Sequence, residues 1–178
     1  SMDASGINTT DEHFDFDVVV YATGFDAMTG AVTRVDIRGV GGRKLADEWE
    51  GGPQNYLGLC VAGFPNFYVI TGPGSPSVLS NMMVSIEQHI DWVSDLIEYM
   101  RDNDKRTVDA TSEAQEAWVA HVAESGDQTL YPLANSWYMG ANVPGKPRVF
   151  LPYIGGCGPY RERCDEVAAN GYEGFVLA

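Results

Sequence analysis

The chain has 178 residues, of which 44% are hydrophobic and 20% charged, and its formal net charge at pH 7 is −14. This length and composition indicate one globular domain with a buried core. So acidic a surface repels phosphate backbones and anionic lipids, which argues against nucleic-acid binding and membrane binding. No apolar run approaches the roughly 20 residues that a bilayer-spanning helix needs, and no basic-then-apolar signal region is expected.

The cysteines bear on redox environment and metal binding. Cys60, Cys157 and Cys164 form an odd set without the spacing of a metal site. We therefore expect reduced thiols, a cytoplasmic protein and no bound metal. The N-terminal dipeptide Ser1-Met2 is typical of the remnant of a cleaved tag.

The N-terminal half is predicted to consist of short strands and turns. Residues 1–15 are polar and are expected to form a frayed arm or the tail of a hairpin. The β-branched run at residues 16–23 predicts a strand covered on both faces, as in parallel sheets. Alternation over residues 31–40 predicts a half-exposed strand. Two more short strands are predicted at residues 59–62 and 67–71.

Helical periodicity governs the second half. One stripe predicts a long amphipathic helix with its apolar residues at Met83, Ile86, Ile90, Val93, Ile97 and Met100. Ser112 and Gln115 form a capping-box pattern that starts a second helix. Its inward stripe is expected at Ala114 or Gln115, Trp118, His121 and Val122. A third helix begins near Pro159 and ends at Gly171, before a final strand at residues 175–177.

A long loop is predicted at residues 129–152, which contain several prolines and glycines. Loops of this length in a compact domain are usually functional or disordered. The aromatic pair Trp137 and Tyr138 has two interpretations. It either packs down as a plug on the domain surface or belongs to a mobile lid over a ligand.

The turn at residues 72–77 lies between a predicted strand and the long helix. Its position is typical of a phosphate-binding turn, but Ser77 replaces the third glycine and two prolines remove N–H donors. A helix N-terminus that faces a polar ligand group and a rigid turn that only packs remain the two alternatives. A Ser75–His89–Asp91 triad is rejected because the Gly-x-Ser-x-Gly elbow is absent.

Four segments together resemble the flavin-containing and Baeyer–Villiger monooxygenases. Ala-Thr-Gly-Phe-Asp at residues 22–26 is similar to their hinge, and residues 71–82 to their flavin-facing loop and helix start. Residues 135–148 resemble their NADP-responsive loop, and residues 164–177 their C-terminus. The resemblance is nearer to the phenylacetone and steroid monooxygenase branch than to cyclohexanone monooxygenase.

The resemblance implies an α/β fold: the C-terminal half of a two-dinucleotide-domain flavoprotein, with short strands, three helices and a long loop. Residues 1–15 would be a polar arm or tag remnant. Residues 16–178 would form the C-terminal part of the FAD-binding domain, with a hinge at 22–26 and the NADP-responsive loop at 129–152.

In that family, FAD reduced by NADPH activates O₂, and one oxygen atom is inserted next to a ketone carbonyl to give an ester or lactone. The resemblance assigns cofactor contacts to Gly24, Asn81, Met82 and Trp137. It assigns the ketone pocket to Ser77, Val78 and Leu79. It places no catalytic residue in this sequence.

The family's FAD and NADP fingerprints, its diagnostic signature and its catalytic arginine are absent from these residues. The chain is therefore expected to be the C-terminal part of such an enzyme, inactive and with little FAD affinity alone. Its partner would be the N-terminal two-thirds, and exposed apolar faces would favour self-association. The alternatives are a non-catalytic interaction or structural domain, and a flavin-dependent S- or N-oxygenase expected to lack the long Trp137 loop.

Overall fold

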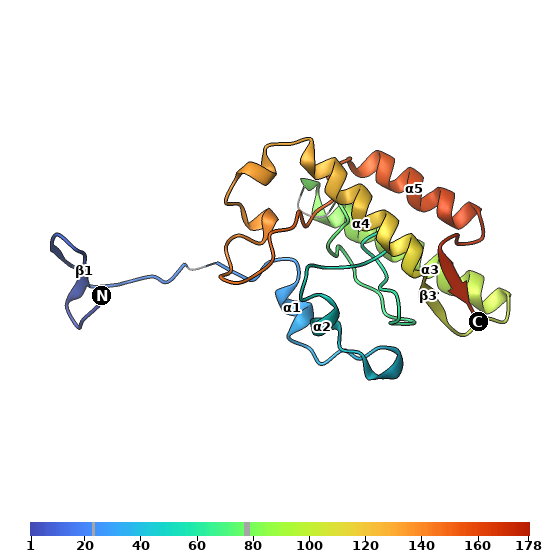
Figure 1. Ribbon diagram of the computed structural model, residues 1–178, viewed down its shortest axis with the longest axis horizontal. Coiled ribbons are helices and arrows are strands. Elements are labelled where there is room, and N and C mark those ends of the chain that lie inside the picture. The colour runs from blue at the N-terminus through green and yellow to red at the C-terminus, as the bar shows by residue number, and fades with distance from the viewer. Residues whose placement is uncertain (23, 77–78) are drawn as a thin grey trace.

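The computed structural model describes residues 1–22, 24–76 and 79–178 (Figure 1). An N-terminal hairpin stands apart from the body on an extended segment. Its strands, β1 (Gly6–Asn8) and β2 (His13–Asp15), pair antiparallel. The arm is therefore a hairpin and is not frayed, because the Asp3 carboxylate accepts hydrogen bonds from the Ser5 and Gly6 amides.

The strand predicted at residues 16–23 is not formed over the part that the structure describes, residues 16–22. These residues have extended backbone without a neighbouring strand, and Val18 and Val20 are 76% and 80% exposed. A strand needs a neighbour to pair its N–H and C=O groups. The apolar pattern predicts a strand covered on both faces, but within the described residues no strand pairs with this segment and most of its apolar side chains are exposed.

The half-exposed strand predicted at residues 31–40 is also wrong. The segment begins with the single-turn helix α1 (Gly30–Thr33), because the Thr29 carbonyl accepts hydrogen bonds from the amides of Val32 and Thr33. The 3₁₀ turn η1 (Val40–Gly42) and helix α2 (Leu45–Glu48) follow. Val32 and Ile37 still pack inward, against a small cluster of Leu45, Trp49, Val61 and Phe64.

The central strands are reduced to bridges. Cys60 pairs with both Tyr56 and Tyr68, and the Val69 amide donates to the Leu59 carbonyl at 2.8 Å. The predicted runs at 59–62 and 67–71 thus lie side by side without forming a regular sheet.

A second two-stranded sheet ends the chain. The predicted final strand, β4 (Phe175–Leu177), pairs antiparallel with β3 (Val108–Ala110), a strand that the sequence pattern does not predict. Both sheets among the described residues are antiparallel, so the parallel pairing expected for the N-terminal strand is absent from them.

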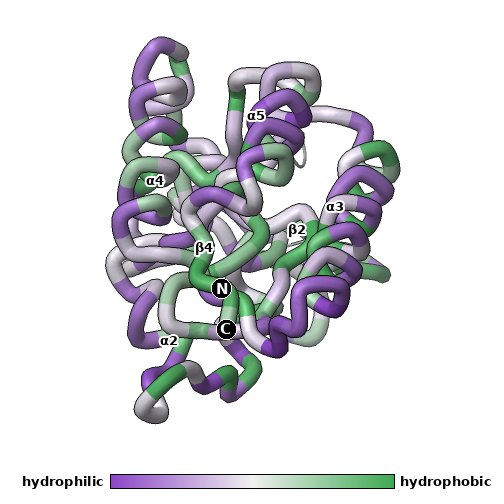
Figure 2. The backbone as a smooth tube through the Cα atoms, turned by 90° about the vertical axis from the view of Figure 1, so that its right-hand side faces the viewer, coloured by the Kyte–Doolittle hydropathy of each residue, from purple (hydrophilic) through white to green (hydrophobic). Residues whose placement is uncertain are grey.

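The three predicted helices are confirmed as α3 (Met82–Asp102), α4 (Ser112–Asp127) and α5 (Cys157–Ala169). All three lie in the right-hand part of Figure 1, and Figure 2 shows α4 and α3 on opposite sides of the body with α5 between them. The cap of α4 is Thr111, one residue before the predicted Ser112, and its hydroxyl accepts from the Ala114 amide. None of the helices in the described part is long and apolar enough to cross a bilayer.

The buried face of α3 differs from the predicted stripe. Trp92 and Leu96 face the core, and the Trp92 indole donates to the Cys164 carbonyl of α5 at 2.9 Å. The buried positions are Ser85, His89, Trp92, Leu96 and Met100. Of the predicted stripe, Met83, Ile90 and Ile97 are exposed. Both hydrophobic and hydrophilic positions occur along α3 in Figure 2. Apolar residues lie on two faces of the helix: the one with Trp92 and Leu96 is buried, and the one with Met83, Ile90 and Ile97 is exposed.

The core forms where α3, α4 and α5 meet the central segment. Its buried members include Tyr56, Leu57, Leu59, Trp92, Leu96, Trp118, Val122, Tyr160, Cys164 and Val167. Two predictions for α4 have different outcomes. His121 is exposed and not inward, whereas the half-buried Gln115 accepts a hydrogen bond from the Ala62 amide at 2.9 Å.

The loop predicted at residues 129–152 is confirmed. It contains only two single 3₁₀ turns among regular elements, η3 (Tyr131–Leu133) and η4 (Trp137–Met139). In Figure 1 this loop runs beside the segment that leads into α1.

Candidate functional site

The turn before α3 is held by side chains from distant parts of the chain. Asn55 is buried; its amide nitrogen donates to the Pro73 carbonyl at 2.6 Å, and its oxygen accepts from the Gly58 amide at 3.0 Å. The Trp118 indole donates to the Gly74 carbonyl at 3.1 Å. Gly74 has φ of +79°, which glycine adopts without strain. The turn is a rigid platform at the start of α3.

The buried rings of His89 and Tyr160 hold the backbone just before this turn. The Thr71 amide donates to His89 Nδ1 at 2.9 Å, so the neutral ring carries its proton on Nε2. That proton points to the Tyr160 hydroxyl at 3.0 Å, which in turn donates to the Leu57 carbonyl at 2.6 Å. Burial lowers the pKa of His89 from 6.5 to about 4. Thr71 and Leu57 both have positive φ, and this chain of hydrogen bonds holds them there.

The N-terminus of α3 contains the sites assigned to Asn81 and Met82. Asn81 is the N-cap, and its side-chain oxygen accepts from the Met83 amide at 3.1 Å. The first turn carries no acidic residue, so the positive end of the helix dipole is not neutralised. Leu79 is half-buried just before the cap. Ser77 and Val78 lie outside the described residues.

The Trp137 loop lies next to this turn. Trp137 is half-buried in η4 and stacks on Tyr138, with ring centroids 4.0 Å apart. The Leu151 amide donates to the Tyr138 carbonyl at 2.9 Å, and the Leu151 carbonyl accepts from the Gly74 amide at 2.7 Å. The structure therefore brings together the loop and the turn before α3, which the sequence separates by some 60 residues.

Gly24, unlike Asn81, Met82 and Trp137, lies away from the turn before α3. It has φ of +81° and is exposed, and a Cβ atom there would meet nothing within 4 Å. It belongs to the exposed segment that connects the hairpin to α1. Its neighbours Phe25 and Asp26 do touch the Trp137 loop, through Asn142 and Lys146.

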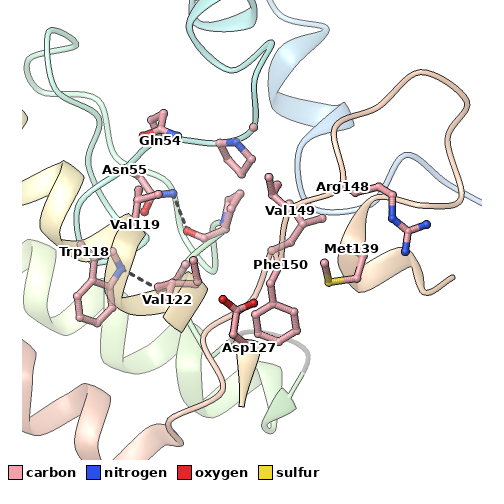
Figure 3. Close-up of a pocket in the computed structure, with 16 residues that line it drawn as sticks. Gln54, Asn55, Trp118, Val119, Val122, Asp127, Met139, Arg148, Val149 and Phe150 are labelled. Atoms are coloured by element: carbon pink, nitrogen blue, oxygen red, sulfur yellow. Dashed lines mark hydrogen bonds between the residues drawn. The ribbon is translucent and has the colours of Figure 1, made fainter. Parts of the chain in front are cut away.

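A cavity of about 230 Å³ opens between α4, the turn and the C-terminal part of the loop (Figure 3). Its walls are mostly apolar, with Asp127 and Arg148 as charged members. The labelled residues in Figure 3 are Gln54, Asn55, Trp118, Val119, Val122, Asp127, Met139, Arg148, Val149 and Phe150. Sequence reasoning missed this cavity and the Asn55 and Trp118 contacts, because no local pattern links residues so far apart.

The rejected hydrolase triad is absent from the structure. The Ser75 hydroxyl donates to the Gly72 carbonyl at 2.7 Å, and both ring nitrogens of His89 are bonded to Thr71 and Tyr160. Within the described ranges, no group of three or more His, Cys, Asp or Glu side chains could hold a metal ion.

No protein-family model matches the chain. Individual proteins do. The acetone monooxygenase (methyl acetate-forming) of Gordonia sp. is 48% identical over 165 residues, which are 92% of this chain and 31% of that protein. The structure of an oxidized steroid monooxygenase bound to NADP is 49% identical and superposes with a TM-score of 0.90 over 99% of this chain. This chain is homologous to the C-terminal portion of Baeyer–Villiger monooxygenases.

The chain spans about a third of the length of the Baeyer–Villiger monooxygenases that it matches. Cyclohexanone monooxygenase from Rhodococcus sp. bound to NADP⁺ has a TM-score of 0.94 and 41% identity, with 98% of this chain and 33% of that chain covered. The α/β fold expected from the resemblance is therefore confirmed.

One relative carries a different chemistry in its name. The phenazine N-monooxygenase of Lysobacter antibioticus is 39% identical over 178 residues, 99% of this chain and 32% of that protein. That alignment spans nearly the whole chain, so similarity of this extent is found both with proteins named as ketone monooxygenases and with one named as an N-monooxygenase.

Proposed function

We propose that this chain supplies the C-terminal part of an FAD- and NADPH-dependent Baeyer–Villiger monooxygenase. The enzyme inserts one oxygen atom of O₂ next to a ketone carbonyl to give an ester or lactone. The observation that carries the proposal is the match of nearly the whole chain, loop included, to ketone monooxygenases at 39% to 49% identity.

The start of α3 fits one edge of a flavin. Its first turn is exposed and free of acidic side chains, and the dipole of a 21-residue helix favours negative charge at this end. Asn81 and Met82 would face the ring there, and FAD would supply the redox chemistry. The sequence has no Gly-x-Gly-x-x-Gly, so the flavin diphosphate would be held by residues outside this chain.

The remaining site assignments extend this proposal. Ser77, Val78 and Leu79 would line the ketone pocket beside the start of α3. Trp137 would contact the nicotinamide cofactor as its loop closes and excludes water from the reaction. Gly24 would act in the hinge, where glycine adopts its positive φ without strain.

The partner of this chain would be the N-terminal two-thirds of the enzyme. Residues 16–22 and the uncovered face of α3 would pack against it. In these two regions the exposed large apolar side chains are Phe16, Val18, Val19, Val20, Tyr21, Met82, Met83, Val84, Ile90, Ile97 and Tyr99. Without that partner we expect self-association. Sedimentation velocity should give a mass that rises with concentration, and a constant monomer mass would contradict this expectation.

The domain boundaries and the location are part of the same proposal. Residues 1–15 would be a separate arm and residues 16–178 the C-terminal part of the FAD domain. The structure pairs none of Cys60, Cys157 and Cys164 in a disulfide, which supports a cytoplasmic protein.

N-oxygenation is the second candidate activity. The match to the phenazine N-monooxygenase supports it, because that protein is 39% identical over 178 residues, which are 99% of this chain. Both activities would use the same cofactors, so they are separated by offering the assembled enzyme either a ketone or an aromatic N-heterocycle such as phenazine and testing for an ester or an N-oxide.

An absorbance titration with FAD tests the proposal. The chain is titrated alone and together with the N-terminal two-thirds of the Gordonia acetone monooxygenase, with that N-terminal piece alone as the control. We expect bound flavin only in the mixture. Binding by the chain alone would show that the fingerprint is dispensable, and no binding in any tube would favour a non-catalytic interaction domain.

A further inference from the structure

Residues Phe25–Ala27, which follow Gly24, lie against the far end of the Trp137 loop. Asn142 Nδ2 donates to the Phe25 carbonyl at 2.7 Å. Lys146 Nζ donates to Asp26 Oδ1 at 2.5 Å and to the Ala27 carbonyl at 3.2 Å. Two side chains of the loop thus reach three consecutive residues that lie well over 100 positions away in sequence.

The ion pair is partly buried. The side chains of Lys146 and Asp26 are 12% and 26% exposed, whereas those of the surface pair Arg38–Asp36 are 51% and 64% exposed. Less exposure means less screening by solvent, and loss of one partner leaves the other charge partly desolvated. The Lys146–Asp26 pair therefore has more influence on local structure than an ordinary surface pair.

Two glycines, one beside each partner, allow Lys146 and Asp26 to come together. A Cβ atom at Gly30 would lie 2.5 Å from the Asp26 side chain, so a larger residue there would displace the carboxylate. Gly140 has φ of +68°, and its missing Cβ leaves room for the Pro147 carbonyl and the Lys146 stem. The loop folds back on itself at Gly140 and so directs Lys146 toward Asp26.

We propose that Asn142 and Lys146 are positioning residues that fasten the Trp137 loop to Phe25–Ala27, so that the two segments move as one unit. Within the proposed function, which gives this motion its purpose, a shift of the hinge would carry the loop with it. Trp137 would then reach its place over the cofactors only when the hinge is in the matching position. The fastening acts through the loop and makes no contact with the reacting atoms.

Hydrogen exchange of the 178-residue chain, followed by mass spectrometry, tests the coupling without flavin, nicotinamide or ketone. The result is thus independent of the proposed function. Lys146→Met should speed exchange about tenfold in both the loop (residues 134–148) and the connecting segment (residues 24–30), as expected for loss of a charged hydrogen bond. Asn142→Ala should act on the same two segments to a smaller extent.

Matched variants separate positioning from general destabilisation. Lys146→Arg should keep exchange near that of the parent, and the double variant Asp26→Lys/Lys146→Asp should restore much of what either single change loses. Arg38→Met, which breaks the exposed pair, should leave both segments unchanged.

Three results would overturn the proposal: faster exchange in one segment only, no change in either, or an equal increase across α3, α4 and α5. The last would mean that the variant loosens the whole domain and that Lys146 has no special link to the hinge segment.

Discussion

The buried His89 should make the chain sensitive to acid. Its pKa lies at about 4 in the folded chain because burial disfavours the charged ring, against 6.5 for an exposed histidine. At pH values between these two pKa values, the His89 ring binds a proton in the unfolded state but not in the folded state. Stability must therefore fall as the pH is lowered through 6.5 toward 4.

The size of the effect follows from the two pKa values. At pH 7 both states are largely neutral at this ring, and the contribution is negligible. At pH 5 the unfolded ring is charged and the folded ring neutral, which removes about 2 kcal/mol from the free energy of unfolding. His89→Gln cannot titrate, while its amide can still accept from Thr71 and donate to Tyr160.

Urea unfolding of the parent and the variant at pH 7 and pH 5 measures this difference. The parent should lose about 2 kcal/mol more than His89→Gln between the two pH values, because the carboxylates common to both cancel. His121→Gln makes the same substitution at an exposed histidine and serves as the matched control. Equal pH dependence of the parent and His89→Gln would refute the account of a buried neutral ring.

Three further predictions concern the turn and the thiols. Asn55→Ala removes two buried hydrogen bonds and should lower the free energy of unfolding by about 2–4 kcal/mol in urea titrations; a loss below about 0.5 kcal/mol would contradict the role of Asn55. Gly74→Ala places a Cβ atom 2.9 Å from the Asn55 oxygen at φ +79°, and should lower the thermal midpoint by several degrees, so an unchanged midpoint would count against the close packing. With Ellman's reagent, the exposed Cys157 should react at once in the folded chain. Cys60 and Cys164 should react only on unfolding, because they are buried and burial raises the pKa of their thiols. Fast reaction of all three cysteines would contradict the burial of Cys60 and Cys164.

Local patterns predict the helices well and the strands poorly, for a physical reason. A helix pairs most of its backbone groups within itself, so the existence of α3, α4 and α5 follows from local sequence patterns, although the cap of α4 and the buried face of α3 do not. A strand depends on a neighbouring strand, and residues 16–22 pair with none in the part of the chain that the structure describes, despite their β-branched sequence. β3 was missed because three residues, Val108–Ala110, carry too short a pattern, and only pairing with β4 defines them.

The buried face of α3 was predicted wrongly for a related reason. Periodicity identifies apolar positions, but it does not say which of two apolar faces the rest of the chain covers. The predicted stripe at Met83, Ile90 and Ile97 is apolar and exposed, while Trp92 and Leu96 are buried. An apolar face that a domain leaves uncovered is a sign that a further segment packs on it.

Much the same holds for the candidate site. The motifs around residues 72–77 and 135–148 were found from sequence, because each is a contiguous run. What holds them together was not predicted: Asn55, Trp118 and the His89–Tyr160 pair act over separations of 18 to 103 residues. Such contacts depend on the tertiary fold and leave no local signature.

The central claim is that this chain is a functional equivalent of the C-terminal part of a ketone monooxygenase. The most direct measurement replaces the matching 165 residues of the Gordonia acetone monooxygenase with this chain and assays the purified chimera. We predict a protein that retains bound FAD and forms methyl acetate from acetone with consumption of NADPH. A folded chimera without bound flavin, or one that binds flavin and oxidises NADPH without forming an ester from any ketone offered, would contradict the claim.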